Sequence, residues 1–593
     1  MYCQLDYLGK CLPGRIRRAL DELPQTLDET YERTLREIDD ANWEFAQRLF
    51  LCVAVTSRPL YVEELAEFLA FDFGAGPIPK YREDWRLEDP LEAVLSTCST
   101  LLALVSIYDS DETHLSNKPN NYPVVQFSHY FVKEFLTSTR FAEKSDTISR
   151  RYHVSLTPAH ILVARTCLGI LLHFDENITR DRLEAFPLAT YAAGHWNDHV
   201  LLSDVSQYEE GMKQLFDANK PHLAVWLWIY DLIRPDDRHA RAETPLPLLR
   251  TPLHYAAFCG FHTVVEYLAD QHPQYVHSRG VDDQSTPLHL ASRGGHVEVA
   301  RVLVDCERGI DVTVQDKDGS TPLHEASTVE MARFLIEHGG DATARDKRGS
   351  TPLHHGVERE YLDLAQFLME HGADLTARDE HGMSPLHIVS DSSNVALIAL
   401  LIEYGADVTA QDENGRTPLL EASRFHSGNM EFVQLFVEHG ADVKAEDNYG
   451  RTPLHIASAF GNLELAKFLI EHGADTTAQD LEGQIPLHYA RDVDLVRFLI
   501  EHGADITVQD KHRSTLLHQA SVRGNVDLAQ FLVENGANAA AQDANGRTPL
   551  HEASRLDLAR FLVENGADAT VQDANGRTPL HQASHLHLAQ VPR

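Results

Sequence analysis

From residue 249 onward, apolar residues recur in two short groups within every stretch of roughly thirty residues. In residues 546–575, Leu550 and Ala553 form the first group, and Leu558, Phe561 and Leu562 form the second. Their spacing of three to four positions predicts two short antiparallel helices, each with one apolar face. Neither helix can bury that face alone, so the pattern predicts helix pairs that stack on one another.

Start and stop signals frame each helix pair. A Thr-Pro-Leu-His string or a near copy begins at residues 251, 286, 321, 351, 384, 417, 452, 485, 515, 548 and 578. Thr548 suits an N-cap and Pro549 the first helical position, because the missing amide hydrogen of proline would be unpaired there anyway. Gly566, directly after Asn565, suits a left-handed helix C-terminus. Each repeat should therefore contain a first helix, a second helix and a connecting turn.

The connecting turn has Asp at its first and Gly at its fourth position, which is typical of a tight β-turn. We call this turn a finger. The Asp and Gly pairs are Asp316/Gly319, Asp346/Gly349, Asp379/Gly382, Asp412/Gly415, Asp447/Gly450, Asp480/Gly483, Asp543/Gly546 and Asp573/Gly576. Two fingers depart from the pattern, because Arg513 replaces the glycine after Asp510 and the "VDDQS" string before Thr286 contains no glycine. These two fingers are expected to be less regular.

The Thr-Pro-Leu-His string at a period of 30 to 35 residues resembles the ankyrin-repeat signature, and the resemblance covers residues 249–593. It implies a mostly α fold in which about eleven repeats build a solenoid. Fingers and first helices would form its concave side, which ankyrin proteins use as a binding surface.

Some repeats are shorter than the others. Alignment of "IASAFGNLELAKFL" with "EASRLDLARFL" places a three-residue deletion at the turn between the two helices, where Gly461 lies in the longer copy. The copies that begin at 321, 485, 548 and 578 all lack this turn. We expect the deletion to shorten the first helix and tighten the hairpin without abolishing stacking.

The first 250 residues lack this period and divide into four predicted segments. Residues 1–56 show helical spacing, and residues 57–140 combine helices with two apolar strands, "TLLALVSI" and "VVQFS", followed by the helix "HYFVKEFLTS". Helices around a hairpin make a winged-helix pattern. Residues 141–233 read as a helical domain, in which Trp226, Trp228 and Tyr230 are expected to pack in a core or between domains rather than form a ligand cage. Residues 234–248 form a charged linker that should permit a hinge.

The strings "LPQTLDETYERTL", "RPLYVEELAEFLA" and "FSHYFVKEFL" resemble the region that follows the nucleotide-binding domain in fungal NACHT proteins, which are NOD-like, STAND-class signalling ATPases. Such proteins commonly end in ankyrin arrays. The resemblance implies that residues 1–56 follow a NACHT domain and that residues 57–140 form a winged helix. It also implies that the chain starts near the end of the ATPase domain, as a truncated relative or an incomplete gene model.

The phosphate loop of the ATPase is absent from the sequence. No GxxxxGK[ST] string occurs, and this string is needed to cradle nucleotide phosphates. In the resembling family the winged-helix histidine can sense nucleotide, and His129 occupies the matching position, with Phe131 in place of the usual serine. Without a phosphate loop, we favour a structural role for His129 at a helix start.

Charge and cysteine content narrow the function classes. The net charge of −37 argues against nucleic-acid binding, and residues 251–593 carry 51 acidic against 26 basic side chains. The seven cysteines form no CxxC pair, which is typical of a reduced intracellular protein. No signal peptide and no run of about 18 apolar residues was found, so the sequence predicts a cytoplasmic protein without a membrane partner.

No catalytic, cofactor or metal site is predicted. "HEAST" at 324 and "HEASR" at 551 lack the second histidine of a zinc-protease HExxH motif. His581, His585 and His587 could share a helix, but a structural zinc site requires four ligands. No nucleophile motif of a hydrolase is present.

Binding of a protein partner is the function class that remains. The ankyrin resemblance places partner contacts on finger tips and at the end of the first helix, here Lys317, Asp318, Lys347, Arg348, Glu380, His381, Glu413, Asn414, Phe425, Asn448, Tyr449, Phe460, Leu481, Glu482, Lys511 and His512. Phe425, Tyr449 and Phe460 are candidates for an aromatic anchor, and the alternative is that they pack between repeats.

The sequence thus predicts a non-enzymatic scaffold whose ankyrin array captures a protein partner on its concave surface, in NOD-like signalling by resemblance. Two alternatives stay open: the C-terminal fragment of a nucleotide-dependent NACHT switch, and a substrate adaptor of a ubiquitin ligase.

Overall fold

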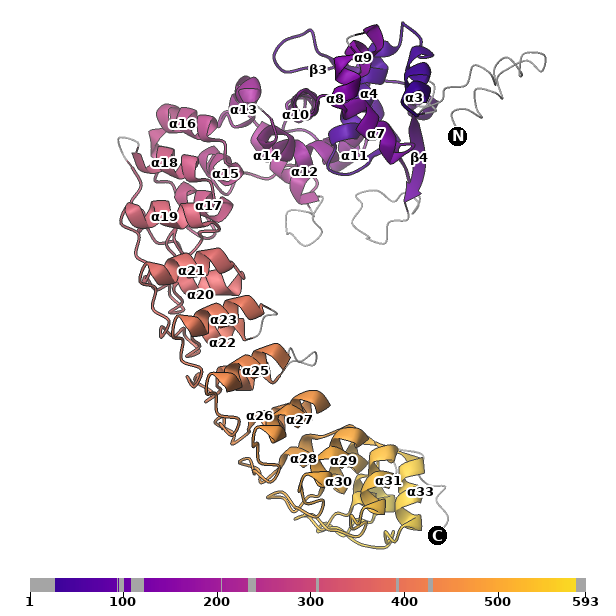
Figure 1. Cartoon of the computed structure of the whole chain (residues 1–593), viewed down its shortest axis with the longest axis vertical. Coiled ribbons are helices and arrows are strands. Elements are labelled where there is room, and N and C mark those ends of the chain that lie inside the picture. The colour runs from indigo at the N-terminus through magenta and orange to yellow at the C-terminus, as the bar shows by residue number, and fades with distance from the viewer. Residues whose placement is uncertain are drawn as a thin grey trace, which may run out of the picture. The chain divides into compact units, whose positions relative to one another are not determined.

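The computed structural model describes residues 27–92, 94, 101–107, 122–144, 146–203, 205–232, 242–305, 309–390, 394–424 and 430–582. The chain divides into two compact units, residues 1–310 and residues 311–593. Figure 1 labels the helices and strands along the chain. None of the helices in the described ranges is long and apolar enough to cross a bilayer.

The first part of unit 1 surrounds a small antiparallel sheet. Strand β5 (Tyr122–Phe127) pairs with β4 (Leu102–Ile107) on one side and with β1 (Leu60–Tyr61) on the other, and β2 (Phe71–Asp72) pairs with β3 (Lys80–Tyr81). The accompanying helices are α3 (Leu27–Arg36), α4 (Trp43–Val55), α5 (Val62–Glu67), α7 (Tyr130–Thr137), α8 (Thr139–Glu143) and α9 (Thr147–Tyr152). The two predicted strands and the helix after them are therefore confirmed.

His129 caps the N-terminus of α7. Its Nδ1 atom accepts a hydrogen bond from the Phe131 amide at 3.3 Å, and the two rings stack with centroids 5.0 Å apart. An imidazole nitrogen that satisfies a first-turn amide stabilises the helix start. The structural role expected for His129 is confirmed.

The second part of unit 1 is helical. It comprises α10 (Leu156–Leu171), α11 (Arg180–Leu183), α12 (Pro187–Leu201), α13 (Glu209–Leu215) and α14 (His222–Leu232). Helices α10 and α12 pack against each other, and both carry fully buried side chains, among them Val163, Leu168 and Tyr191. Trp226 and Trp228 are buried too, and each donates its ring N–H to a backbone carbonyl at 3.0 Å. The packing role expected for these two tryptophans is confirmed.

An aromatic cluster joins this helical part to the first repeat. The Trp196 ring lies 5.2 Å from Phe261 and 5.3 Å from Trp226, and Phe216 lies 6.0 Å from Phe261, centroid to centroid. All four rings are buried, and Phe261 belongs to the turn after α15 (Pro252–Cys259). These contacts argue against the expected hinge in the linker, because they hold the first repeat against α12 and α13.

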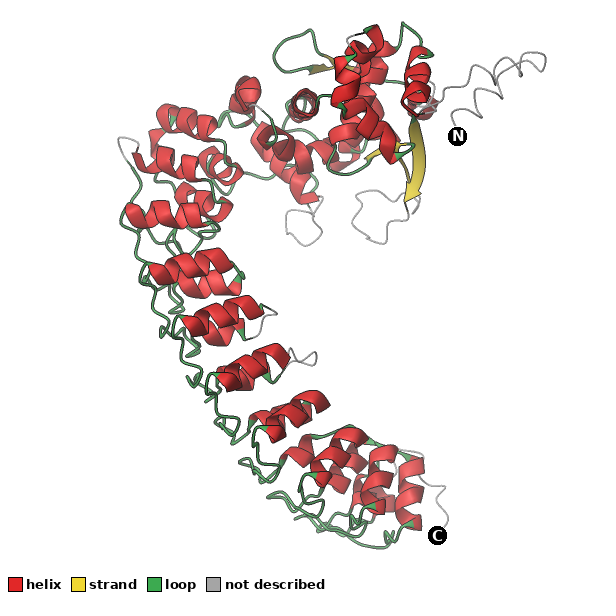
Figure 2. Cartoon of the chain, in the orientation of Figure 1, coloured by secondary structure: helices red, strands yellow, loops and turns green. Residues whose placement is uncertain are grey.

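The repeats contribute paired helices to both units. Unit 1 holds α15, α16 (His262–Gln271), α17 (Pro287–Gly294) and α18 (Val297–Asp305). Unit 2 holds α19 (Val329–Glu337), α20 (Pro352–Glu358), α21 (Leu362–Glu370), α22 (Pro385–Val389), α23 (Val395–Glu403), α24 (Pro418–Ala422), α25 (Met430–Glu438), α26 (Pro453–Ala459), α27 (Leu463–Glu471), α28 (Pro486–Tyr489), α29 (Val493–Glu501), α30 (Leu516–Arg523), α31 (Val526–Glu534), α32 (Pro549–Glu552), α33 (Leu556–Glu564) and α34 (Pro579–Gln582). Figure 2 shows the loops that connect them.

The two apolar groups of residues 546–575 are largely buried, as predicted. Leu550, Ala553, Leu558 and Leu562 are buried between the helices, and Phe561 is half-buried. Gly566 has φ +94°, and the amide of the next residue, Ala567, donates to the Leu562 carbonyl at 2.9 Å. The left-handed helix end is therefore also confirmed.

Short repeats have short first helices. The first helix has 7 or 8 residues in the long repeats that begin at 251, 286, 351, 452 and 515, and 5 residues in the long repeats that begin at 384 and 417. In the short repeats that begin at 485 and 548 it has 4 residues, and residues 322–325 form turns rather than an α-helix. The second helix keeps 9 residues in both kinds, as α27 and α29 show. The first helix is therefore shorter in these short repeats than in the long repeats, as predicted.

Candidate interaction surface

Each regular finger is closed by the side chain of its first residue. One carboxylate oxygen of Asp447 accepts hydrogen bonds from the amides of Tyr449 and Arg451, both at 2.9 Å. The Gly450 amide donates to the Asp447 carbonyl at 2.8 Å, and Gly450 has φ +74°. Asp satisfies amides that a turn leaves open, and Gly adopts the left-handed conformation without steric cost. The Asp and Gly of the motif are thus explained by local chemistry.

The two fingers that depart from the motif behave differently. Arg513 adopts φ +60°, and the finger keeps its usual hydrogen bonds, with the amides of His512 and Ser514 donating to Asp510 at 2.9 and 2.8 Å. The expected irregularity is wrong here, because the arginine accepts the strained conformation. At residues 280–285 the turn is one residue longer, with Gln284 donating to the Gly280 carbonyl at 3.1 Å, so the expectation is confirmed.

Replacement of Arg513 by glycine should stabilise the array. A left-handed conformation costs a residue with a Cβ atom about 1 kcal/mol, and Arg513→Gly removes that cost. We expect a gain of about 1 kcal/mol in urea unfolding of the full chain. Lys511→Gly in the same finger is the control, because it relieves no left-handed residue. An equal response of the two variants would contradict this account.

A backbone ladder joins the fingers of unit 2. The amide of the second residue in each finger donates to the carbonyl of the third residue in the preceding finger. The pairs are Lys347 N to Asp318 O (2.8 Å), Glu380 N to Arg348 O (2.5 Å), Glu413 N to His381 O (3.0 Å), Asn448 N to Asn414 O (2.8 Å), Leu481 N to Tyr449 O (2.8 Å), Lys511 N to Glu482 O (2.8 Å), Ala544 N to His512 O (2.7 Å) and Ala574 N to Asn545 O (2.8 Å). The finger tips thus form one continuous edge, which we call the finger edge.

The histidines of the repeat motif tie each repeat to the next. The Thr452 amide donates to Nδ1 of His455 at 3.1 Å, so the other ring nitrogen, Nε2, carries the hydrogen and donates to the Gln484 carbonyl at 3.1 Å. The same bridge runs from His254 to Ser285, His324 to Ser350, His354 to Met383, His387 to Arg416, His518 to Arg547 and His551 to Arg577. These rings are buried, and burial lowers the pKa of His254 and of His324 to about 4.

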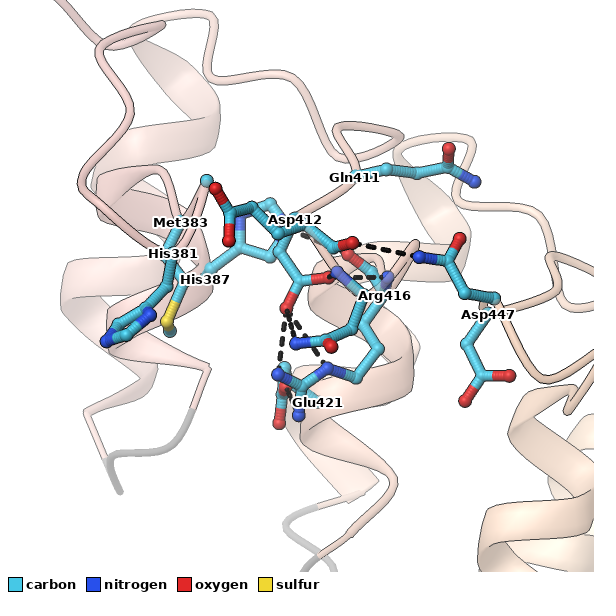
Figure 3. Close-up of polar contacts among 12 residues, drawn as sticks. His381, Met383, His387, Gln411, Asp412, Arg416, Glu421 and Asp447 are labelled. Atoms are coloured by element: carbon cyan, nitrogen blue, oxygen red, sulfur yellow. Dashed lines mark hydrogen bonds and ion pairs between the residues drawn. The ribbon is translucent and has the colours of Figure 1, made fainter.

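The repeat that begins at Thr417 replaces this histidine with Leu420 and carries an ion-pair network instead (Figure 3). Arg416 lies between two buried carboxylates, with Nη2 2.9 Å from Asp412 and Nη1 2.5 Å from Glu421. Arg424 contacts the other oxygen of Glu421 at 2.9 Å. Similar pairs join Arg359 to Glu325 at 3.0 Å and Arg451 to Asp447 at 2.7 Å. The charged side chains nearest the first helices therefore mostly form ion pairs within the array.

The side chains at the finger tips, in contrast, are exposed to solvent. All fifteen predicted contact residues within the described ranges are exposed: Lys317, Asp318, Lys347, Arg348, Glu380, His381, Glu413, Asn414, Asn448, Tyr449, Phe460, Leu481, Glu482, Lys511 and His512. Phe425 lies outside the described residues. The finger edge brings the finger residues of this set together in chain order, whereas Phe460 lies at the end of α26.

The exposure of the Tyr449 and Phe460 side chains distinguishes an aromatic anchor from packing between repeats. Tyr449 is 58% exposed and Phe460 37% exposed, so neither ring lies in the core between repeats. The Arg451 guanidinium lies 4.8 Å from the Tyr449 ring centroid and covers part of the ring. Tyr449 is thus a supported but open aromatic surface, which is the geometry an anchor needs.

Metal ligation has no structural support in the described part of the chain. Within these residues no group of three His, Cys, Asp or Glu side chains could hold a metal ion. His324 and His551, the first histidines of the two incomplete HExxH strings, are used in bridges between repeats. Of the three histidines near the C-terminus, His585 and His587 lie outside the described residues.

Comparisons with known proteins agree with the repeat geometry. A family model of ankyrin repeats, three copies long, matches residues 222–316, 308–379, 375–447, 425–510, 487–573 and 517–591. These matches together cover more than half of the chain and begin at α14, before the first Thr-Pro-Leu-His string.

Two relatives match parts of the chain. Azaphilone pigments biosynthesis cluster protein L of Monascus ruber is 27% identical over 309 residues, which are 49% of this chain and 61% of that protein. Ankyrin repeat-containing protein P1E11.10 of Schizosaccharomyces pombe is 43% identical over 51 residues, 9% of this chain and 24% of that protein. The chain thus spans less than two thirds of the length of either relative.

Among solved structures, the ankyrin repeat domain of Bcl-3 matches with 28% identity and a TM-score of 0.32, over 36% of this chain and 99% of that domain. The family assignment rests on the repeat model. The ankyrin fold is typically a non-enzymatic interaction fold, and the matches indicate no enzyme family. With its bridging histidines, Asp and Gly fingers and paired helices, the chain belongs to the ankyrin-repeat family.

Proposed function

We propose that this chain is a non-enzymatic scaffold that binds a protein partner along the finger edge. The observation that carries this proposal is the backbone ladder, which holds exposed tip residues of successive repeats in a fixed order. A backbone that is already ordered loses little conformational entropy on binding, and this preorganisation favours affinity. Arg359, Arg416 and Arg451 below the edge are paired with buried carboxylates, whereas the tip side chains are exposed to a partner.

A position-specific crosslinking experiment tests the proposal. A photoreactive residue at Asn448, on the finger edge, should capture a partner in cells of the source organism. The same residue at Glu464, exposed on the second helix α27, should capture little of it. Equal capture of the same protein at both positions would refute binding along the finger edge.

Two aromatic substitutions test the anchor. Tyr449→Ala together with Phe460→Ala should weaken partner binding at least about tenfold, because aromatic anchors commonly carry more than about 1.4 kcal/mol of binding energy. The thermal stability of the chain should change little, since both side chains are exposed. Binding is measured by titration of the captured partner. A large loss of stability would show instead that the rings belong to the core.

We further propose that residues 57–140 act as a winged-helix module beside the array, as in NOD-like proteins. The antiparallel β4–β5 hairpin, the short β1 and the His129-capped helix α7 support this reading. The Monascus relative, named for a biosynthetic cluster, is compatible with a fungal protein class of this kind. A relay from the array to this module is the corresponding mechanism.

A further inference from the structure

The chemical character of the finger edge changes along unit 2, although the chain as a whole is strongly acidic. Lys347 and Arg348 occupy both tip positions of one finger. The next two fingers carry Glu380 and Glu413, and the two after them carry the exposed apolar side chains Tyr449 and Leu481. A partner that follows the edge therefore meets a basic, an acidic and an apolar section in this order.

The basic section presents two exposed cations, with one neighbouring acid, Asp346, buried and another, Glu380, exposed beside Arg348. The Asp346 carboxylate accepts hydrogen bonds from the amides of Arg348 and Ser350, and its side chain is only 5% exposed. Arg348 is 73% exposed and lies 3.8 Å from Glu380. The Lys347 ammonium donates to the Lys317 carbonyl at 2.5 Å, which holds it beside the edge with donors to spare. This section therefore favours carboxylates on a partner.

The apolar section is held by the ladder itself. The Leu481 amide donates to the Tyr449 carbonyl at 2.8 Å, so one rung of the ladder joins these two residues. Tyr449 is 58% and Leu481 55% exposed. Arg451, which supports the Tyr449 ring, is itself paired with buried Asp447 at 2.7 Å. An apolar side chain of a partner can lie against both without displacing a paired charge.

We propose that the finger edge binds one extended segment of a partner protein. The segment carries a group of carboxylates against Lys347 and Arg348 and an apolar side chain against Tyr449 and Leu481. This proposal rests on the proposed function and specifies the chemistry of the partner. The part of the segment that crosses Glu380 and Glu413 is neutral or basic, because acids there would be repelled.

The spacing follows from the repeat geometry. Tyr449, where the apolar section begins, is three repeats beyond Lys347 and Arg348, and stacked helices pack at about 8–10 Å, so it lies about 24–30 Å from the basic section. An extended chain advances about 3.3 Å per residue. The carboxylates and the apolar residue of the partner are therefore separated by about seven to nine residues. A nucleic-acid strand fits less well, because its uniform phosphates would meet Glu380, Glu413 and Glu482.

Selection from a library of random 16-residue peptides, displayed on phage and panned against the full chain, tests this inference. We expect the enriched peptides to combine an acidic group and an apolar residue at the stated spacing, with affinity that falls as salt is raised. Lys347→Glu with Arg348→Glu should weaken these peptides at least about tenfold, and Tyr449→Ser should do the same. Lys467→Glu, on the second helix α27, is the matched control and should change binding less than about twofold.

The outcomes separate the two proposals. If Tyr449→Ser weakens the peptides but the double charge reversal does not, or if enriched peptides lack the acidic group, the charge pattern is refuted and edge binding survives. If no peptide responds to any finger variant, or none is enriched, edge binding by an extended segment is refuted. Tighter binding of a single-stranded oligonucleotide, lost in the charge-reversal variant, would assign the basic section to nucleic acid instead.

Discussion

Lowering the pH from 7 to 5 is expected to destabilise the chain by about 2 kcal/mol for each bridging histidine whose pKa burial lowers to about 4, namely His254 and His324. The unfolded imidazole has a pKa of about 6.5, so between pH 6.5 and pH 4 the unfolded state binds more protons than the folded state. Stability is thus fully present above pH 6.5 and is lost as the pH falls toward 4. Urea unfolding at both pH values measures the difference.

The structural reason lies in the direction of the bridge. Nδ1 of His324 and of His455 accepts a hydrogen bond from a backbone amide, and Nδ1 of His254 is paired with the Thr251 hydroxyl, so a protonated ring would place a second hydrogen on a nitrogen that is already paired. Burial also lowers the pKa of His354, His387, His455, His488 and His518, so these residues add to the same effect. The array should therefore lose more stability with acid than either histidine contributes alone.

The natural sequence offers a matched control, since Leu420 already replaces this histidine. His455→Leu should cost about 1–3 kcal/mol at pH 7, because it leaves the Gln484 carbonyl and the Thr452 amide without their partner. The same variant should reduce the loss between pH 7 and pH 5, because one titrating group is gone. An unchanged pH dependence in this variant would show that the acid effect arises from other groups.

Phe261→Ala is expected to cost about 3–5 kcal/mol of stability in unit 1, because it opens a cavity among Trp196, Phe216 and Trp226. The cluster joins helices α12 to α14 to the first repeat, so both sides should lose protection together. Hydrogen exchange resolved by segment measures this, with α12 and α15 as the reporters.

Phe258→Ala provides the control for Phe261→Ala. Phe258 lies on α15, a few residues away, but its side chain is 49% exposed, so its removal should cost less than about 0.5 kcal/mol. If Phe261→Ala exposes α15 to exchange but leaves α12 protected, the first repeat and the helical part are not coupled through this cluster.

Much of the fold could be predicted from the sequence because each repeat carries its own local instructions. Thr and Pro set a helix start, Asp and Gly set a turn, and the apolar spacing sets the buried faces. The length of the first helix in short repeats was predictable for the same reason, since the deletion removes residues at one known turn. Arg513 shows the limit of such rules, because the ladder and the Asp510 side chain hold the finger in shape at the expense of one strained residue.

The finger edge itself was not predictable in this way. Its hydrogen bonds join backbone atoms, and such bonds do not require a particular residue type at either position. The histidine bridge was equally hidden, since the motif shows that a histidine recurs but not that its far nitrogen reaches the next repeat. The exposed tip residues were found because the turn pattern alone places them outward. The ladder shows which tip residues are neighbours along the edge, so the order of the basic, acidic and apolar sections could not be predicted without it.

The ladder also makes the order of the tip residues along the finger edge independent of the number of residues in each repeat. Successive repeats use 30, 33 or 35 residues, yet each adds one rung with the same two tip positions. Length differences are absorbed on the helix side, as in the shortened helices α28 and α32. Gain or loss of residues there would leave the order of tip side chains intact, while duplication of a repeat would shift it by one whole step. The recognition surface can therefore diversify by single tip substitutions while the helices vary in length independently.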